Sequence, residues 1–183
     1  MQRVSVVGNS GSGKSTLARS LAATLVSSYV ELDAIQHLPG WQALDPEEFV
    51  AQATELAAGE RWVIDGNYRL AVVEGPIWQR ADTVVWLRLP RRTVMRQIVR
   101  RTLRRVLTRE RLWNGNRESF RNLWHWNPEK NVILWAWTQH AKYEARYSTA
   151  QRDERFAHLR FIELRSRREA HAWLSSLSAN REA

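Results

Sequence analysis

The chain contains no cysteine among its 183 residues, which excludes disulfide bonds and thiolate metal sites. Its five histidines lack the spacing of metal ligands, so no zinc site is expected: His37, His125, His140, His158 and His171. No apolar run approaches the roughly 20 residues that span a bilayer, and no signal peptide precedes the first apolar run. We therefore expect a cytoplasmic protein without a membrane partner.

Glycine and lysine are also scarce, with 8 and 3 residues, yet several of them gather in one motif. Residues 8–16 read Gly-Asn-Ser-Gly-Ser-Gly-Lys-Ser-Thr, a complete G-x-x-x-x-G-K-[ST] phosphate loop. The alternative is a glycine-rich turn that matches by chance. However, an apolar run at residues 4–7 precedes the loop, and apolar residues at helical spacing follow it. We predict that a nucleoside triphosphate binds to Gly8, Asn9, Ser10, Gly11, Ser12, Gly13, Lys14, Ser15 and Thr16.

Each part of this loop has a physical task. The glycines let the backbone turn its N–H groups onto phosphate oxygens, and the following helix directs its positive dipole end at the same anion. Lys14 is expected to reach the β- and γ-phosphates, the Ser15 hydroxyl to bind Mg²⁺, and Thr16 to contact the α-phosphate. The motif therefore predicts ATP and Mg²⁺ as cofactors.

Two carboxylates stand at the ends of short apolar strands. Asp33 follows a strand predicted at residues 29–32, and Asp65 ends a strand predicted at residues 62–65. Ligands gather at the carboxyl ends of parallel strands. We interpret Asp33 as an acceptor-binding carboxylate or general base, with a helix cap or turn residue as the alternative. We interpret Asp65 as a Mg²⁺-site carboxylate, with a turn-forming Asp-Gly as the alternative. Gly66 would permit close approach to a substrate.

Positive charge is concentrated after the phosphate-loop half of the chain. Residues 1–90 carry 7 basic and 10 acidic side chains, whereas residues 91–183 carry 21 and 9. A helix predicted over residues 91–112 has one stripe able to pack, made of Val94, Ile98, Thr102 and Val106. Ten arginines and one acid, Glu110, lie within residues 91–117. Because like charges at helical spacing repel, an anion is expected on part of this face, either a nucleotide phosphate or a nucleic acid.

The remaining patterns complete an α/β fold. They predict helices over residues 45–58 and 127–147, strands over 81–87 and 160–164, and a last helix that begins with a capping box of Ser166 and Glu169. In the second helix Ile133, Trp137 and Ala141 lie at packing spacing. We predict one P-loop NTPase domain over residues 1–183, a three-layer αβα sandwich. Its five-stranded parallel sheet has the order 2-3-1-4-5, with a helical lid-like segment around residues 100–130.

With these motifs in place, the chain resembles the nucleoside-monophosphate-kinase-like branch of the phosphate-loop proteins. Residues 65–69, Asp-Gly-Asn-Tyr-Arg, look like the Asp-Gly-Phe-Pro-Arg segment of adenylate kinases, which implies that Arg69 binds the acceptor phosphate. Residues 96–101, Arg-Gln-Ile-Val-Arg-Arg, resemble the Arg-x-x-x-Arg-Arg run where the adenylate kinase lid begins. This resemblance implies that Arg96 lies against the adenine and that Arg100 holds transferring phosphates.

A closer resemblance covers nearly the whole chain. The segments at residues 32–34, 39–41, 62–68, 81–83, 89–91 and 164–166 look like the bacterial DNA topology modulation proteins, or adenylate-kinase-related proteins. The family name does not establish an activity. In related kinases the loop at residues 164–167 would border the adenine base, which implies that Arg165 and Ser166 contact the nucleotide.

The hypothesis that unites these observations is an ATP- and Mg²⁺-dependent phosphotransferase acting on a small-molecule acceptor. Its catalytic residues would be Lys14, Asp33, Arg96 and Arg100. The alternative is a nucleic-acid-associated NTPase or nucleotide-dependent DNA binder that uses the basic helix of residues 91–117. No helix-turn-helix, zinc or RNA-binding signature supports that alternative. The sequence identifies neither the acceptor nor the oligomeric state.

Overall fold

The computed structural model describes residues 1–119, 124–128 and 131–182. Its centre is a parallel sheet in the order β2-β3-β1-β4-β5, which confirms the predicted topology. The strands are β1 (Arg3–Gly8), β2 (Ser28–Glu31), β3 (Trp62–Asp65), β4 (Thr83–Leu87) and β5 (Arg160–Leu164). Strand β1 lies between β3 and β4, so that Val6 is paired with Asp65 on one side and Val85 on the other. The end of β1 and its phosphate loop therefore lie at the middle of the sheet edge.

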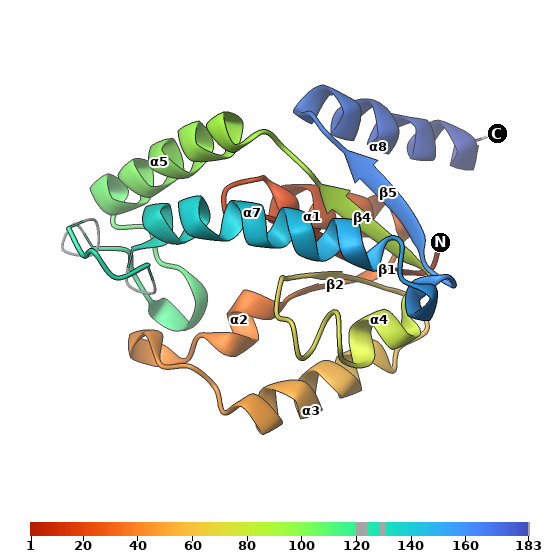
Figure 1. Cartoon of the computed structure of the whole chain (residues 1–183), viewed down its shortest axis with the longest axis horizontal. Helices are drawn as coiled ribbons and strands as arrows, with labels where there is room; N and C mark the ends of the chain where they lie inside the picture. Colours follow the sequence, from red (N-terminus) through yellow and green to blue (C-terminus); the bar gives the residue numbers. More distant parts are fainter. Residues whose placement is uncertain (120–123, 129–130, 183) are drawn as a thin grey trace.

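Helices cover both faces of the sheet (Figure 1). On one face, α1 (Lys14–Leu25) and α8 (Arg167–Glu182) pack on apolar strand residues such as Val4 and Val63. On the other face, α3 (Pro46–Ala57), α4 (Pro76–Arg80) and α7 (Val132–Ala150) enclose a second core around Trp78 and Tyr147, which are both fully buried. Among the described residues, no helix is both long and apolar enough to cross a bilayer.

Several helices begin where the sequence predicts. The Asp45 side chain caps α3 by accepting hydrogen bonds from the N–H groups of Glu47 and Glu48. The Ser166 hydroxyl accepts a hydrogen bond from the Glu169 N–H at 3.1 Å, which confirms the capping box before α8. The sequence analysis missed α4, because its five residues are too few to show a helical period.

Helix α7 differs from the prediction in its start and in its buried face. It begins at Val132, because the Asn131 side chain caps it by accepting from the N–H groups of Ile133 and Leu134. Residues 129–130 of the expected start lie outside the described residues. The expected stripe is wrong: Trp137 is 50% exposed, and the buried residues of α7 are Ala136, Tyr143, Tyr147 and Ala150. The cap places the first helical residue five residues after the expected start at residue 127.

Helix α5 (Arg91–Thr108) leaves the end of β4 and runs over the phosphate loop (Figure 1). Its buried residues are Val94, Ile98, Thr102 and Val106, which confirms the predicted packing stripe. The helix ends four residues before the predicted residue 112, since Arg109 adopts a left-handed conformation with φ 50°. The first part of the predicted lid-like segment is thus the second half of α5. Residues 120–123 and 129–130 of that segment are not described.

After α5 the chain lies against the short elements that follow β2. The elements that follow β2 are α2 (Leu32–Gln36) and η1 (Pro39–Trp41), and the segment after α5 that contacts them contains η2 (Trp113–Gly115). A further short helix, η4 (Glu154–Phe156), precedes β5. Asn114 donates from its side-chain amide to the carbonyls of Ala34 and His37. Asn116 donates to the Leu38 carbonyl at 2.9 Å and accepts from the Trp41 N–H at 3.0 Å.

An aromatic cluster reinforces this contact. The His37 ring stacks on Trp113 with centroids 5.6 Å apart and meets Trp41 edge-on at 5.3 Å. These contacts hold the α2–η1 segment and η2 together on one side of the sheet edge.

Candidate functional site

The phosphate loop joins β1 to α1 in the conformation that its glycines permit. Gly11 and Gly13 have φ values of 83° and 93°, where a side chain would be strained. Gly13 caps α1 without a side-chain hydrogen bond, so the first N–H groups of the helix are available to an anion. A Cβ atom added to Gly11 would lie 2.8 Å from the Cβ of Ile98. The loop tip is therefore pressed against α5.

Two asparagine side chains fix the root of this loop. The Asn67 amide donates to the Gly8 carbonyl at 2.6 Å and accepts from the Gly8 N–H at 3.1 Å. The buried Tyr147 hydroxyl donates to the same Asn67 oxygen at 3.0 Å. Asn9 donates to the Ala136 carbonyl of α7 at 2.7 Å. Sequence reasoning missed Asn67, although its position just after the Asp65-Gly66 strand end was a usable signal.

Lys14 and Asp65 form a buried ion pair at the base of the loop. The distance between Nζ and Oδ1 is 3.4 Å, and the side chains are 10% and 1% exposed. Burial opposes the charge on Lys14, but Asp65 and then Asp33 outweigh it and raise the pKa of Lys14. Burial also dominates at Asp65, where it raises the pKa of the carboxyl to about 6 despite the attraction of Lys14. Both Asp65 oxygens are buried without a hydrogen-bond partner of good geometry, although the Ser15 side chain lies close enough to lower the pKa of the carboxyl.

Asp33 lies in α2, one residue beyond the predicted strand end, and faces the same site. The Tyr68 hydroxyl donates to Asp33 Oδ1 at 2.6 Å. Burial, and after it the charge of Asp33, raises the pKa of Tyr68, so the phenol stays protonated and acts as the donor. Tyr68 itself packs on the ring of Phe49, with centroids 4.8 Å apart. Asp33 is thus a positioned carboxylate.

Gly66 has a packing role beside these carboxylates. A Cβ atom at this position would lie 2.7 Å from Cδ1 of Leu32, the fully buried residue that precedes Asp33. The glycine lets the end of β3 approach α2 closely. It therefore helps to bring Asp33 and Asp65 to one edge of the sheet.

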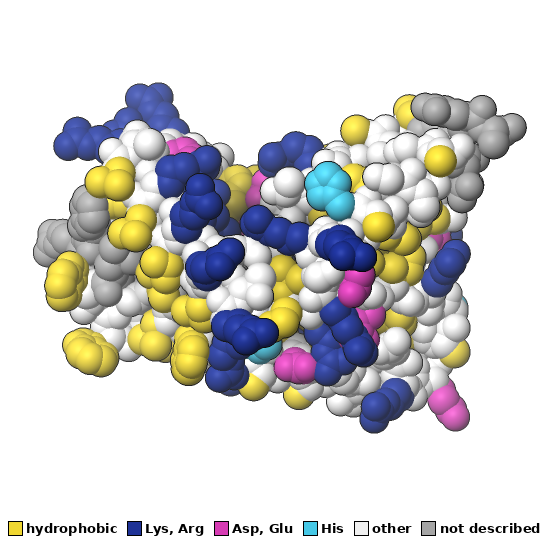
Figure 2. Space-filling model, turned by 90° about the horizontal axis from the view of Figure 1, so that it is seen from above, with side chains coloured by type: hydrophobic (Ala, Val, Ile, Leu, Met, Phe, Trp, Pro, Cys, Tyr) yellow, Lys and Arg dark blue, Asp and Glu magenta, His cyan; other side chains and the backbone are white. Residues whose placement is uncertain are grey.

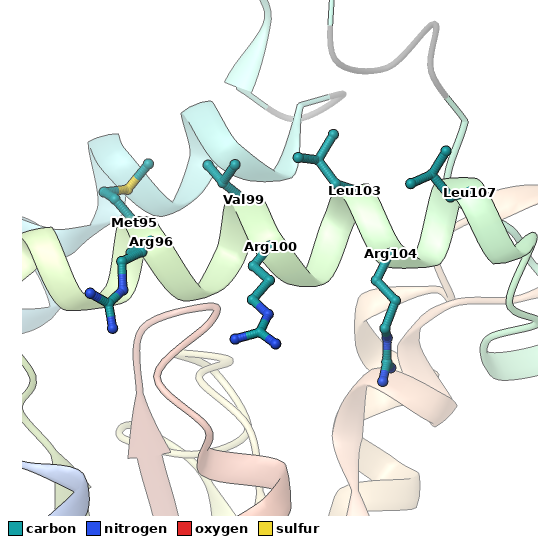
Figure 3. A pocket seen from close by; sticks show the side chains of 7 residues that line it. All are labelled: Met95, Arg96, Val99, Arg100, Leu103, Arg104 and Leu107. Carbon is teal, nitrogen blue, oxygen red and sulfur yellow. The ribbon is translucent and has the colours of Figure 1, made fainter.

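The arginines of α5 divide into different faces. Figure 3 shows Arg96, Arg100 and Arg104 on one side of the helix, opposite an apolar row of four residues. These two rows line an open groove along the outer surface of α5: Met95, Arg96, Val99, Arg100, Leu103, Arg104 and Leu107. Arg96 and Arg100 are exposed. In the space-filling view, dark blue side chains form a band across the molecule (Figure 2).

Arg101 belongs to the inward side of α5, next to the buried Thr102. Its Nε atom is buried and has no hydrogen-bond partner. Burial and then repulsion from Arg105 lower the pKa of Arg101, while Glu118 and Asp33 oppose that effect. The sequence does not single out Arg101, because α5 has two arginine stripes at helical spacing that look equivalent until their neighbours are known. One stripe is Arg92, Arg96, Arg100 and Arg104, and the other is Arg101, Arg105 and Arg109.

The other predicted site residues are placed less centrally. Arg69 is 62% exposed and forms an ion pair with Glu74 at 2.8 Å, so the structure does not bring it to Asp33. Arg165 donates from Nε to Glu163 at 2.6 Å. The next residue, Ser166, is the helix cap described above. Their loop nevertheless reaches α5, because Arg167 donates to Gln97 at 3.0 Å beside Arg96.

No protein-family model matches the sequence, and no curated protein matches it. Solved structures with the same fold include shikimate kinase from Bacteroides thetaiotaomicron, with a TM-score of 0.58, 16% identity, and coverage of 100% of this chain and 99% of that one. Shikimate kinase from Acinetobacter baumannii in complex with shikimate has a TM-score of 0.55 and 19% identity, with 100% and 96% covered. A gluconokinase from Sinorhizobium meliloti 1021 has a TM-score of 0.51 and 18% identity, with 99% and 95% covered.

These similarities show the fold of phosphate-loop kinases over the whole length of the chain. At such low identity they do not carry an activity or a substrate across. The resemblance to DNA topology modulation proteins stays a prediction.

Proposed function

We propose that the protein is an ATP-dependent kinase that phosphorylates a small molecule. The observation that carries the proposal is the convergence of a phosphate loop and a positioned carboxylate at one sheet edge. Lys14 is held by Asp65 at 3.4 Å, and Asp33 is held by Tyr68 at 2.6 Å. The charge of Asp33 raises the pKa of Lys14, so the two groups lie within one electrostatic environment. Phosphoryl transfer requires a phosphate-binding cation and a group that binds the acceptor hydroxyl to lie close together.

Mg²⁺ fits the residues at the base of the loop. The Asp65 carboxylate oxygens are buried without a hydrogen-bond partner of good geometry, and Mg²⁺ prefers such hard oxygen donors. Ser15 and Asp65 would hold the ion, as the motif predicts. When bound, it would neutralise charge on the β- and γ-phosphates. Among the described residues no cluster of three His, Cys, Asp or Glu side chains occurs, and a phosphate-bound Mg²⁺ does not need one.

Asp33 would act on the acceptor. In the proposed transfer, the acceptor hydroxyl oxygen attacks the γ-phosphorus, and the bond from that phosphorus to the bridging oxygen breaks. ADP leaves, and Asp33 takes the hydroxyl proton. The hydrogen bond from Tyr68 keeps one Asp33 oxygen occupied and the carboxylate oriented. Positioning and charge stabilisation therefore provide the catalysis, without a covalent intermediate on the protein.

Arg96, Arg100, Arg165 and Ser166 would lie on the nucleotide side. They come from two segments that the Arg167–Gln97 hydrogen bond joins. Arg96 and Arg100 flank Ile98, the residue against which the loop tip packs. Their exposed guanidinium groups would close on the triphosphate when it binds. Gly66 and Arg69 would complete the acceptor side only if Arg69 leaves its ion pair with Glu74. The comparisons give no support to nucleic-acid binding by residues 91–117.

The test is a panel of nucleosides, nucleoside monophosphates, sugars and small hydroxy acids, each incubated with ATP and Mg²⁺. ADP release and phosphorylated product should appear together for one chemical class. ADP release that no acceptor increases, with no phosphorylated product by mass spectrometry, would overturn the kinase proposal. A steep fall of DNA affinity with salt in the same preparation would then favour the nucleic-acid alternative.

A further inference from the structure

We propose that Arg101 binds an anionic group of the acceptor, so that the substrates of this kinase are negatively charged hydroxy compounds. This inference rests on the proposed function, because it assumes that the protein has an acceptor substrate. It starts from the uncompensated positive charge of Arg101, to which the proposed phosphoryl transfer assigns no role. A guanidinium with a buried Nε and no partner is costly, and such a group is expected to be compensated when a ligand is present.

The neighbours of Arg101 are paired, and Arg101 is not. Arg105 lies 3.1 Å from Glu118, and Arg104 lies 2.9 Å from Glu110. Within residues 1–119, 124–128 and 131–182, no carboxylate lies within ion-pair distance of Arg101, and its Nε–H donates to no acceptor. The two acids nearest along the chain are thus already taken by other arginines.

The position of Arg101 points toward the acceptor. Helix α5 touches the phosphate loop at Ile98, where Gly11 packs. Arg101 lies three residues further along the same side of the helix, toward η2, and η2 is hydrogen-bonded to α2, which carries Asp33. The charge of Asp33 acts on the pKa values of both Arg101 and Lys14. Arg101 therefore lies on the side of α5 that packs on the phosphate loop, within electrostatic reach of the proposed base.

Helix α7, which packs against α5, carries a second cation that forms no ion pair within the described part of the chain. Arg146 of α7 lies over the ring of Tyr143 at 5.4 Å and donates weakly to the Asn67 carbonyl at 3.5 Å. Tyr143 is within electrostatic reach of Arg146, Lys14 and Asp33. Asp65 is already paired with Lys14. Among the described residues, Arg101 and Arg146 thus have no carboxylate partner, and an acceptor that brings a carboxylate or phosphate would compensate their charge.

Two sources of negative charge compete for Arg101: the acceptor and the γ-phosphate of ATP. The experiment separates them by filling the nucleotide site first. Protein saturated with Mg²⁺ and a non-hydrolysable ATP analogue is titrated with inorganic phosphate by isothermal calorimetry. Arg101→Met keeps the apolar stem and removes the charge, Arg101→Lys restores a cation, and Arg109→Met is the matched variant at an exposed arginine at the end of α5.

We expect Arg101→Met to weaken phosphate binding by at least about tenfold, the effect of losing one charge-assisted contact. Arg109→Met should change it by less than twofold, and Arg101→Lys should recover part of the loss. The melting temperature of ligand-free Arg101→Met should equal or exceed that of the wild type, whereas loss of a structural ion pair would lower it.

Three results would overturn the inference. One is the absence of phosphate binding to the nucleotide-saturated wild type, and another is equal binding by Arg101→Met. The third is a weakened affinity of Arg101→Met for the ATP analogue itself, which would assign the arginine to the γ-phosphate. Phosphate binding that depends on Arg101, in a protein that phosphorylates no acceptor, would contradict the proposed function but leave the anion site intact.

Discussion

The phosphate loop and helix α5 both supply positive charge to one site, but they hold it differently. Lys14 is buried, and its partner Asp65 is 1% exposed. Arg96 and Arg100 are exposed along the outer groove of α5 (Figure 3). A fixed, desolvated charge interacts strongly with a ligand, whereas an exposed one is screened by water and salt. The burial and the ion pairs of these cations therefore predict their contribution to ligand binding better than their number does.

The largest difference is expected between a buried and an exposed lysine. Lys14→Ala should lower ATP turnover by about a thousandfold, or ~4 kcal/mol, because the β- and γ-phosphates lose their charged partner. Lys142→Ala, on the exposed side of α7, should leave the rate within about twofold. Steady-state ADP release measures both, with circular dichroism as the check of folding. Equal rates for the two folded variants would remove the phosphate loop from the site.

The buried pair should also make stability depend on pH. The pKa of Asp65 is raised to about 6 in the folded protein, against an ordinary value of 3.8. The folded state therefore binds this proton more tightly than the unfolded state does. Its contribution to the stability of the ligand-free protein is present below about pH 4 and is lost as the pH rises to about 6.

The change is on the order of 3 kcal/mol in the free energy of unfolding. Urea unfolding between pH 4 and 7 measures it, and Asp65→Asn should flatten the curve in this window. A curve that keeps the wild-type slope in Asp65→Asn would assign the pH dependence to another group. Activity should change in the opposite direction, because a protonated Asp65 cannot support Mg²⁺.

The proposed base should affect transfer without affecting nucleotide affinity. Asp33→Asn keeps the shape and the contact with Tyr68 but removes the charge and the proton acceptor. We expect transfer to fall by about a hundredfold, while the dissociation constant of ATP changes by less than about threefold. Calorimetry and single-turnover rates on one preparation provide the comparison. Wild-type transfer would show that Asp33 is only a turn residue.

The smallest effect is expected within the exposed face of α5. Arg100→Ala should lower the maximal rate by about threefold to tenfold, more than Arg109→Ala, because Arg100 is close to Ile98 and the loop tip. Arg109 lies nine residues further, about 13 Å along a helix at 1.5 Å per residue. If the Arg100 effect persists at high salt, the side chain reaches the phosphate in a closed site. Equal, salt-sensitive losses would favour diffuse attraction of an anion, including nucleic acid.

The sequence predicted those parts of the molecule that depend on local patterns. The packing stripe of α5, the Asp45 cap and the strand ending in Asp65 each follow from spacing within one element. The start of α7 depended on whether Asn127 or Asn131 caps the helix, and its buried face depended on which elements pack against it. Arg101 could not be separated from Arg100, because the difference lies in which face of α5 is buried, and that depends on elements that the helix meets only in the folded protein.

The clamp between Asn67 and Gly8 has a consequence for chain length. Past the Val6–Asp65 pair the two strands part, and the Asn67 amide continues their hydrogen bonding from a side chain. Residues 65–68 thereby carry the proposed metal carboxylate, the support of the phosphate loop and the partner of Asp33. A single inserted residue in this segment would displace all three together. The length of residues 65–68 therefore sets the spacing of the site.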